Sequence, residues 1–480
     1  MKILLFFILL STQIFADQEE PSRDILLPPQ TIQTVDGTVK YSASRGLVPV
    51  LDGDKKEQSQ IHYIAYFLEP QNSTRPILFC FNGGPGSSSV WLHMGLLGPF
   101  IVQAEHETKA PYQLIQNRQT ALRYADLIFI DPVSTGFSVS KNLESDKKFL
   151  GVKEDISSCT QCIQTLLSRF NRWNSPLYLV GESYGGLRAV GIAAALKEKS
   201  MINVDGIFMI SPAIDLQSIV ENSILSQICA FPTYALIAQY FKKSSAENLK
   251  KSKDLLYQEA RLFAQTALFP LLIQGDSSNE KQTVEAAKKM EDYTGISAKD
   301  LKDTFLHLPV TQFQEKLLKE KSLMLGTFDG RTTITVPLTS STCTFDPSLD
   351  SIATPFVETA MQYLRDKLGW DGKGSYTILA REHGWDWKGN GVETGFGYLS
   401  YTDQLRCLML RCPNLKLFVA SGFYDLATPM YSQEYTVDQL LLKNKERITI
   451  KKFESGHMIY LSPQNRDTLL ESMQQFICGK

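Results

Sequence analysis

The segment Gly181-Glu182-Ser183-Tyr184-Gly185-Gly186 lies between an apolar run at 177–180 and an alanine-rich, helix-like segment that extends through Ala195. This order predicts a buried strand, a glycine-flanked serine and an immediate helix, so that a tight turn presents the hydroxyl at the end of a sheet. The glycines permit strained backbone and close approach of neighbouring chain. Ser183 is therefore a candidate nucleophile, provided that a base reaches it.

Further apolar runs of strand length surround this segment. They occupy residues 61–68, 77–81, 127–130, 207–210, 415–420 and 448–453, with helix-like stretches between them. Near-continuous apolar runs separated by helices are typical of a sheet that is covered on both faces and mostly parallel at its centre. The sequence therefore predicts an α/β fold.

A region of different character interrupts this alternation at 216–349. It is helical in pattern, rich in lysine, and has a strand signal only near residues 332–337. We expect it to be a cap inserted between two parts of the core, 17–215 and 350–480. Acidic residues are interspersed with the lysines, so a solvated helix face is favoured over a binding patch.

Two strand ends late in the chain carry the acid and the base that a nucleophilic serine needs. Asp425 follows the run at 415–420, and His457 follows the run at 448–453. Catalytic groups of α/β sheets gather at the carboxyl ends of strands, so these residues can converge with Ser183. We expect His457 to accept the serine proton, and Asp425 to fix the imidazole tautomer and stabilise its charged form.

The chain has six histidines, which allows the alternatives to be compared. His93 is the main competitor of His457 because it follows a glycine-rich loop. It precedes Ser183, however, whereas the expected chain order is serine, acid, histidine. His457 is therefore preferred.

The glycine-rich loop itself, N-G-G-P-G-S-S-S at residues 82–89, follows the strand-like run at 77–81. It lacks the lysine and the spacing of a phosphate-binding loop. We expect backbone N–H groups of Gly84 in this loop and of Tyr184 after the nucleophile to form an oxyanion hole.

The composition and the N-terminus bear on location. The formal net charge is −2, from 49 basic and 51 acidic residues, which favours neither nucleic acid nor an anionic membrane as partner. Lys2, an apolar run at 3–10 and a small residue at Ala16 predict a signal peptide at 1–16. A short membrane anchor is the alternative, but the run is too short for stable insertion. We expect a secreted or periplasmic protein.

The eight cysteines fit an oxidising compartment but leave the disulfide pairing open. Cys159 and Cys162 lie within an amphipathic helical pattern, so core-facing thiols or a local bridge are favoured over a redox site. No His/Cys cluster has the spacing of a zinc site, and no metal or cofactor is expected.

Taken together, these motifs resemble the serine carboxypeptidases, and most closely their bacterial members. The resemblance rests on the loop at 82–89, the segment at 181–186, Asp425, the G-H-M sequence around His457, and the D-P-V-S-T-G-F-S sequence at 131–138. It spans about residues 80–460. The resemblance implies an alpha/beta-hydrolase fold, with a mostly parallel sheet flanked by helices, and a serine-type enzyme that removes C-terminal residues from peptides.

In that family, residues at the positions of Asn82, Gly83 and Glu182 bind the terminal carboxylate of the substrate. The substrate would accordingly be a peptide with a free C-terminal carboxylate, and a homodimer is left open. Two carboxylates about 3 Å apart cannot both remain ionised, so Glu182 must hold a proton when substrate is bound. We therefore expect peptide hydrolysis to be favoured at acidic to neutral pH.

Two positions depart from the family pattern. A tryptophan that helps to bind the terminal carboxylate is Cys80 here, and a cysteine of the glycine loop is Ser87. The first departure keeps a second enzyme class under consideration, a secreted esterase or acyltransferase that uses the same triad. A non-catalytic, cap-bearing scaffold is a third alternative, although such proteins usually lose a member of the triad.

Overall fold

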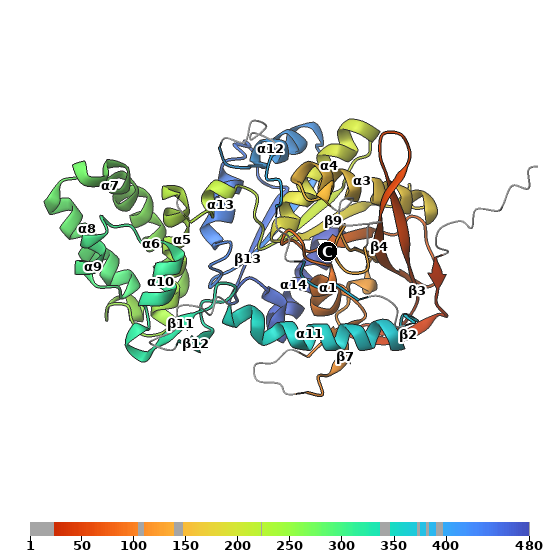
Figure 1. Cartoon of the computed structure of the whole chain (residues 1–480), viewed down its shortest axis with the longest axis horizontal. Coiled ribbons are helices and arrows are strands. Elements are labelled where there is room, and N and C mark those ends of the chain that lie inside the picture. The colour runs from red at the N-terminus through yellow and green to blue at the C-terminus, as the bar shows by residue number, and fades with distance from the viewer. Residues whose placement is uncertain are drawn as a thin grey trace, which may run out of the picture.

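The structure is a computed structural model that describes residues 24–103, 110–138, 147–221, 223–336, 346–371, 375–380, 384–389 and 397–479. The predicted signal peptide lies outside these residues. A twisted sheet with helices on both faces forms one part of the molecule, and a group of helices beside it forms the other (Figure 1). This is the α/β architecture that the sequence predicts.

The centre of the main sheet is parallel. Its strands are short, and all except the edge strand β14 are almost wholly buried, because helices cover both faces. In spatial order they are β8 (Asp126–Ile130), β5 (Ile77–Phe81), β9 (Leu177–Glu182), β10 (Gly206–Ile210), β13 (Lys416–Gly422) and β14 (Ile448–Phe453). The carboxyl ends of β5, β9, β13 and β14 therefore lie on the same side of the sheet. The predicted site residues follow directly after these strand ends.

Antiparallel strands extend the sheet beyond β8. Strand β4 (Glu57–Leu68) pairs antiparallel with β8 and with the long β3 (Gly37–Leu51), which also pairs with β1 (Ile25–Leu26) and β2 (Gln30–Thr34). Strands β1 to β3 are not among the strands that the sequence predicts. A separate hairpin joins β6 (Phe100–Val102) to β7 (Leu114–Gln116).

Two apolar clusters fill the space between the sheet and its helices. One cluster lies under α3 (Val152–Arg169), α4 (Tyr184–Ser200) and α12 (Thr402–Arg411). The other involves α1 (Val90–Leu92), the π-helix η1 (His93–Leu97), α11 (Pro347–Asp366) and α14 (Pro463–Cys478). Cys159 and Cys162 are free thiols buried in the first cluster, as core-facing thiols would be.

A third apolar cluster belongs to the helical region between β10 and β13. Its elements are α5 (Ile224–Tyr240), α6 (Lys253–Phe263), α7 (Phe269–Gln274), α8 (Glu280–Thr294), α9 (Ala298–Asp303), α10 (Val310–Lys316), and the paired strands β11 (Leu323–Leu325) and β12 (Thr333–Thr335). The cluster also includes Met430 of α13 (Met430–Asp438), which packs on α5. This cluster is separate from the two clusters of the sheet region, and the division into an inserted cap and a core stays a prediction.

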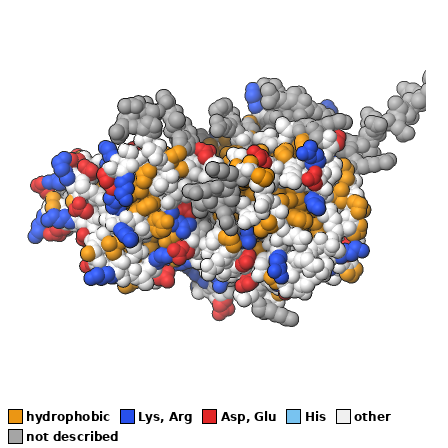
Figure 2. All heavy atoms as spheres, turned by 90° about the horizontal axis from the view of Figure 1, so that it is seen from below, with side chains coloured by type: hydrophobic (Ala, Val, Ile, Leu, Met, Phe, Trp, Pro, Cys, Tyr) orange, Lys and Arg blue, Asp and Glu red, His pale blue; other side chains and the backbone are white. Residues whose placement is uncertain are grey.

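The surface of this helical region carries both charge signs. Lys251 pairs with Glu247 and Glu259, and Lys302 pairs with Glu280. Figure 2 shows basic and acidic side chains mixed over this part of the molecule. The mixture agrees with the expectation of a solvated surface rather than a basic binding patch.

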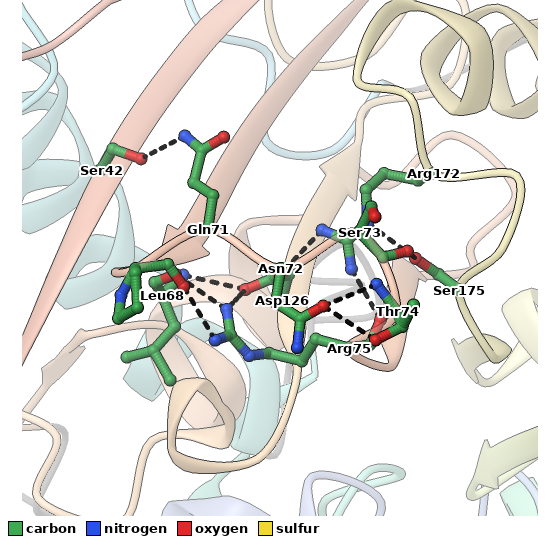
Figure 3. Close-up of polar contacts among 11 residues, drawn as sticks. Ser42, Leu68, Gln71, Asn72, Ser73, Thr74, Arg75, Asp126, Arg172 and Ser175 are labelled. Atoms are coloured by element: carbon green, nitrogen blue, oxygen red, sulfur yellow. Dashed lines mark hydrogen bonds and ion pairs between the residues drawn. The ribbon is translucent and has the colours of Figure 1, made fainter.

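At the amino ends of the central strands, a buried carboxylate joins several loops. Asp126 receives hydrogen bonds from the Leu68 amide and from Arg75, and it forms an ion pair with Arg172 (Figure 3). Arg172 also donates to the Arg75 carbonyl. This cluster stabilises the loops at the amino ends of the strands, opposite the predicted site.

Candidate active site

Ser183 occupies the turn between β9 and α4. Its backbone has φ 59° and ψ −128°, a conformation that residues other than glycine rarely adopt and that stores strain at functional sites. The turn is so tight that a Cβ atom on Gly181 would lie 2.0 Å from the Gly185 carbonyl oxygen. The glycines are thus required by the turn, and the serine side chain is only half-buried.

Asp425 and His457 meet beyond the ends of β13 and β14. The Nδ1 atom of His457 lies 2.8 Å from Oδ2 of Asp425, and both side chains are buried. The other carboxylate oxygen, Oδ1, accepts hydrogen bonds from the amides of Ala427 and Thr428. These contacts fix the carboxylate so that it orients the imidazole.

The segment after β10 connects this pair to the Ser183 turn. The Ile210 carbonyl accepts from the amide of Ser183, and the Ser183 carbonyl accepts from the Ala213 amide. Between these contacts, the Ser211 hydroxyl donates to the backbone carbonyl of His457 at 2.7 Å. The serine turn and the histidine loop therefore share one hydrogen-bonded frame.

The imidazole of His457 retains one free nitrogen. Its Nε2 atom is buried and has no hydrogen-bond partner, and no hydrogen bond joins it to Ser183 in the described structure. Burial by itself lowers the pKa of His457, but the charge and hydrogen bond of Asp425, with Glu182 nearby, raise it above the usual 6.5. The nitrogen that a general base would present to the serine is thus unoccupied.

The glycine-rich loop packs directly on the serine turn. A Cβ atom on Gly83 would lie 2.6 Å from the Tyr184 nitrogen and 2.7 Å from the Glu182 carbonyl oxygen, so only glycine fits. Tyr184 is the first residue of α4, where backbone N–H groups have no partner within the helix. Gly84 follows at φ 98°. The two expected oxyanion donors therefore belong to backbone segments in contact.

Two supports of this loop were not recognised in the sequence. The Arg188 guanidinium, fully buried in α4, pairs with Asp155 of α3 at 2.8 Å and also donates to the Asn82 carbonyl. Asp131 accepts from both the amide and the hydroxyl of Ser89 at 2.8 Å. Their partners lie from 33 to 106 residues away in the chain, so no local pattern indicates them.

Glu182, the last residue of β9, is buried beside the loop. Asn82 Nδ2 donates to its Oε2 at 2.6 Å, and the Tyr460 hydroxyl lies 2.8 Å from Oε2 and 3.1 Å from Oε1. Burial raises the pKa of Glu182 to about 7, against the opposing effects of His457, Tyr460 and Asn82. A carboxyl group that is protonated near neutral pH can donate a hydrogen bond to an anion.

The other histidines within the described residues contact groups other than Ser183. His93 Nε2 lies 2.7 Å from the Tyr66 hydroxyl, and burial lowers the pKa of His93 to about 3. His62 pairs with Asp131, and His307 contacts Gln227 in the cap. None of them bonds to Ser183, whereas His106 and His383 lie outside the described residues.

The inserted region reaches the histidine loop. The Phe328 carbonyl accepts from the His457 amide at 2.6 Å, and the two rings meet edge to face with their centroids 4.8 Å apart. A cavity of about 560 Å³ adjoins this contact, lined from the insert by Phe328 and Arg331 and from the core by Gly456 and Met458. The insert therefore forms one wall beside the candidate base.

Neither metal binding nor membrane crossing has structural support within the described ranges. No three side chains of His, Cys, Asp or Glu there are grouped to hold a metal ion. Likewise, none of the helices described combines the length and the apolar character needed to cross a bilayer.

Comparison with known proteins identifies the family. The model of the serine carboxypeptidase family matches residues 34–460, which is most of the chain. The chain belongs to the serine carboxypeptidase family. This agrees with the resemblance of the motifs at 82–89, at 181–186 and around His457.

Individual relatives match over shorter regions. Serine carboxypeptidase-like 36 of Arabidopsis thaliana is 30% identical over 159 residues, which are 32% of this chain and 31% of that protein. The pheromone-processing carboxypeptidase KEX1 of Zygosaccharomyces rouxii is 28% identical over 162 residues, 32% of this chain and 22% of that protein. The matches thus span about a third or less of these two relatives.

A solved structure supports the fold over nearly the whole length. The prohormone-processing carboxypeptidase Kex1(delta)p of Saccharomyces cerevisiae superposes with a TM-score of 0.55 at 17% identity, covering 91% of each chain. This likeness confirms the alpha/beta-hydrolase fold of the chain.

Proposed function

We propose that this protein is an active serine-type carboxypeptidase, which releases C-terminal amino acids from peptides through an acyl-enzyme formed on Ser183. The observation that carries the proposal is the meeting of three arrangements at one sheet edge: a strained serine turn, an Asp425–His457 pair with a free Nε2, and a buried carboxyl at Glu182. Membership of the family supports the same activity.

In the proposed mechanism, His457 Nε2 removes the proton from the Ser183 hydroxyl as the oxygen attacks the scissile carbonyl. The N–H groups of Gly84 and Tyr184 stabilise the negative oxygen of the tetrahedral intermediate. His457 then gives the proton to the leaving amine, and water hydrolyses the acyl-enzyme by the same steps. Asp425 stabilises the imidazolium throughout.

The terminal carboxylate of the peptide would be held by Asn82, with Gly83 beside it, and by Glu182. Neutral Glu182 donates a hydrogen bond to the carboxylate, whereas ionised Glu182 repels it. The active form therefore carries a proton on Glu182 and none on His457 Nε2. Activity should fall in alkali as Glu182 ionises. It should also fall in acid as His457, whose pKa lies above its usual 6.5, takes up a proton, so the maximum is expected near neutral pH, at the upper end of the acidic to neutral range.

Mass spectrometry of a peptide incubated with the enzyme tests the reaction. We expect stepwise loss of single C-terminal residues from the free acid and none from the C-terminal amide. A fluorophosphonate should label the wild type but not Ser183→Ala, whose turnover should fall by about 10⁶-fold. Internal cleavage, or equal cleavage of acid and amide, would contradict the proposal.

The second candidate, an esterase or acyltransferase, is favoured only by Cys80, a buried thiol at a position where the family carries a carboxylate-binding tryptophan. Turnover of amino-acid or sugar esters without release of residues from peptides would support this candidate. Labelling of Ser183 distinguishes both enzymes from a non-catalytic scaffold. Export through residues 1–16 remains part of the proposal, to be tested by N-terminal sequencing of the mature protein.

A further inference from the structure

Tyr460 lies three residues after the candidate base and reaches the carboxyl group of Glu182. Its hydroxyl is 2.8 Å from Oε2 and 3.1 Å from Oε1, and the side chain is buried. The ring position is fixed by close packing, since a Cβ atom on Gly95 would lie 2.5 Å from the Tyr460 ring. The hydroxyl is therefore held against one carboxyl group.

The direction of the hydrogen bonds in this cluster follows from Asn82. Its Oδ1 atom accepts from the Leu92 amide at 3.0 Å, which leaves Nδ2 as the group that donates to Oε2 of Glu182. Burial raises the pKa of Tyr460 well above 10, so its hydroxyl also remains a donor at the relevant pH. Oε2 thus accepts two hydrogen bonds, one from Asn82 Nδ2 and one from the Tyr460 hydroxyl, which lies closer to Oε2 than to Oε1.

Two donors on Oε2 determine where neutral Glu182 carries its proton. An oxygen that already accepts two hydrogen bonds is a poor site for a third hydrogen, so the proton belongs on Oε1. We propose that Tyr460 is a positioning residue for substrate recognition: with Asn82, it occupies Oε2 and thereby directs the proton on Oε1 of Glu182 toward the terminal carboxylate of the peptide. This inference rests on the proposed carboxypeptidase function and adds a residue to it.

No other described side chain takes this part. Asn82 and Tyr460 are the only side chains that bond to Glu182 within the described ranges. Cys80, two residues before Asn82, directs its weak donor back to the Leu78 carbonyl of its own strand, with Sγ 3.8 Å from that oxygen. Strand β5 and the loop after it therefore supply a single side-chain donor to Glu182, which is Asn82. Tyr460 supplies the second donor.

The charges around Glu182 set the expected pH response. Burial raises its pKa, whereas His457 and the donors Tyr460 and Asn82 lower it, and Asp425 raises it. A hydrogen bond donated to the ionised form favours that form. Removal of the Tyr460 hydroxyl should therefore raise the pKa of Glu182 further and keep Glu182 neutral to a higher pH.

The test compares Tyr460→Phe with the wild type on two substrates, a blocked dipeptide with a free carboxylate and a blocked amino-acid methyl ester without one. We expect KM for the free acid to rise roughly tenfold, because the hydrogen bond from Glu182 to the charged carboxylate of the substrate would be lost. The ratio of kcat/KM for acid over ester should fall by a similar factor. The alkaline limb of kcat/KM for the acid should move to higher pH.

The control is Tyr234→Phe, which removes a buried hydroxyl that donates to the Leu308 carbonyl in the cap. It should change neither the acid-to-ester ratio nor the alkaline limb. Titration of active sites with a fluorophosphonate corrects for any misfolded fraction of Tyr460→Phe.

Equal effects of Tyr460→Phe on acid and ester, with an unmoved alkaline limb, would overturn the inference and leave only a structural role. A wild type that hydrolyses the ester but not the acid would instead overturn the proposed function. The two failures are thus distinguishable.

Discussion

At the scale of single residues, Glu182 and His457 form a coupled pair that holds one proton in the proposed active form. The pKa of Glu182 is about 7 and that of His457 stands above 6.5, each influenced by the other. Coupled groups titrate as a pair, so the limbs of a pH profile describe the pair rather than either residue. A bound carboxylate beside Glu182 favours the arrangement with the proton on Glu182.

Replacement of Glu182 by glutamine should remove the alkaline loss of peptide binding. The amide donates a hydrogen bond at every pH, so KM for a free-acid dipeptide should stay level between about pH 6 and pH 9, whereas the wild-type KM should rise there. Steady-state kinetics across this range would check the prediction. A variant KM that still rose as the wild type does would assign the alkaline limb to another group.

The same replacement should alter the dependence of stability on pH. Between pH 4.5 and about 7 the folded wild type keeps the Glu182 proton and the unfolded chain releases it, so the free energy of unfolding decreases as pH rises. The free energy of unfolding of Glu182→Gln, relative to that of the wild type, should therefore increase by up to about 3 kcal/mol between about pH 4 and pH 8. Each unit by which folding raises the pKa of Glu182 contributes roughly 1.4 kcal/mol. Urea unfolding at both pH values measures this gain.

At the scale of elements, α3 and α4 brace the glycine-rich loop through a buried charge. Arg188 joins Asp155 of α3 to the Asn82 carbonyl, and its guanidinium lies 5.1 Å from the centroid of the Tyr184 ring. The loop is also paired from the far side, where the Ala380 amide donates to the Gly86 carbonyl. The glycine-rich loop therefore takes its shape from helices and a segment distant in sequence.

Arg188→Met should destabilise the fold by about 3–5 kcal/mol, because it leaves the Asp155 carboxylate buried and unpaired. The double variant with Asp155→Asn should recover part of that loss, since no charge then remains unpaired. Denaturant unfolding of the two single variants and the double variant, as a double-mutant cycle, measures the coupling. Strictly additive effects would show that the pair does not act as a unit.

At the scale of the whole molecule, the helical region at 216–349, which we propose to be a cap, and the sheet region have separate apolar clusters. Met430 of α13 packs with α5 in the cap cluster, only five residues after Asp425. Phe328 of the insert contacts His457. The position of the cap is therefore coupled to the acid and the base of the proposed triad.

Met430→Ala should destabilise the protein by about 2–5 kcal/mol and loosen the cap first. Hydrogen exchange should quicken in α5 and α13 while the amides of β5 and β9 remain protected. Leu470→Ala, a buried site in α14 of a sheet-side cluster, serves as the matched control and should not give this pattern. Uniform loss of protection in Met430→Ala would indicate that cap and core unfold together.

Features that depend on the local order of residues were predictable before folding is considered. Apolar runs marked the central strands because most of these strands are buried on both faces. The glycines marked the Ser183 turn because a Cβ atom on Gly181 would clash with the Gly185 carbonyl. Asp425 and His457 could be assigned because each follows a strand in the expected order. The triad and the carboxylate site nevertheless remain proposals.

Other features depend on contacts between segments that are far apart in the chain. Strand β3 contains Gly46, Pro49 and several polar residues, so its extended form depends on pairing with β4 and not on an apolar pattern. The contacts of Arg188 with the Asn82 carbonyl and of Tyr460 with Glu182 span 106 and 278 residues. Such contacts form only when strand order brings distant segments to one sheet edge, and no periodicity along the chain records them.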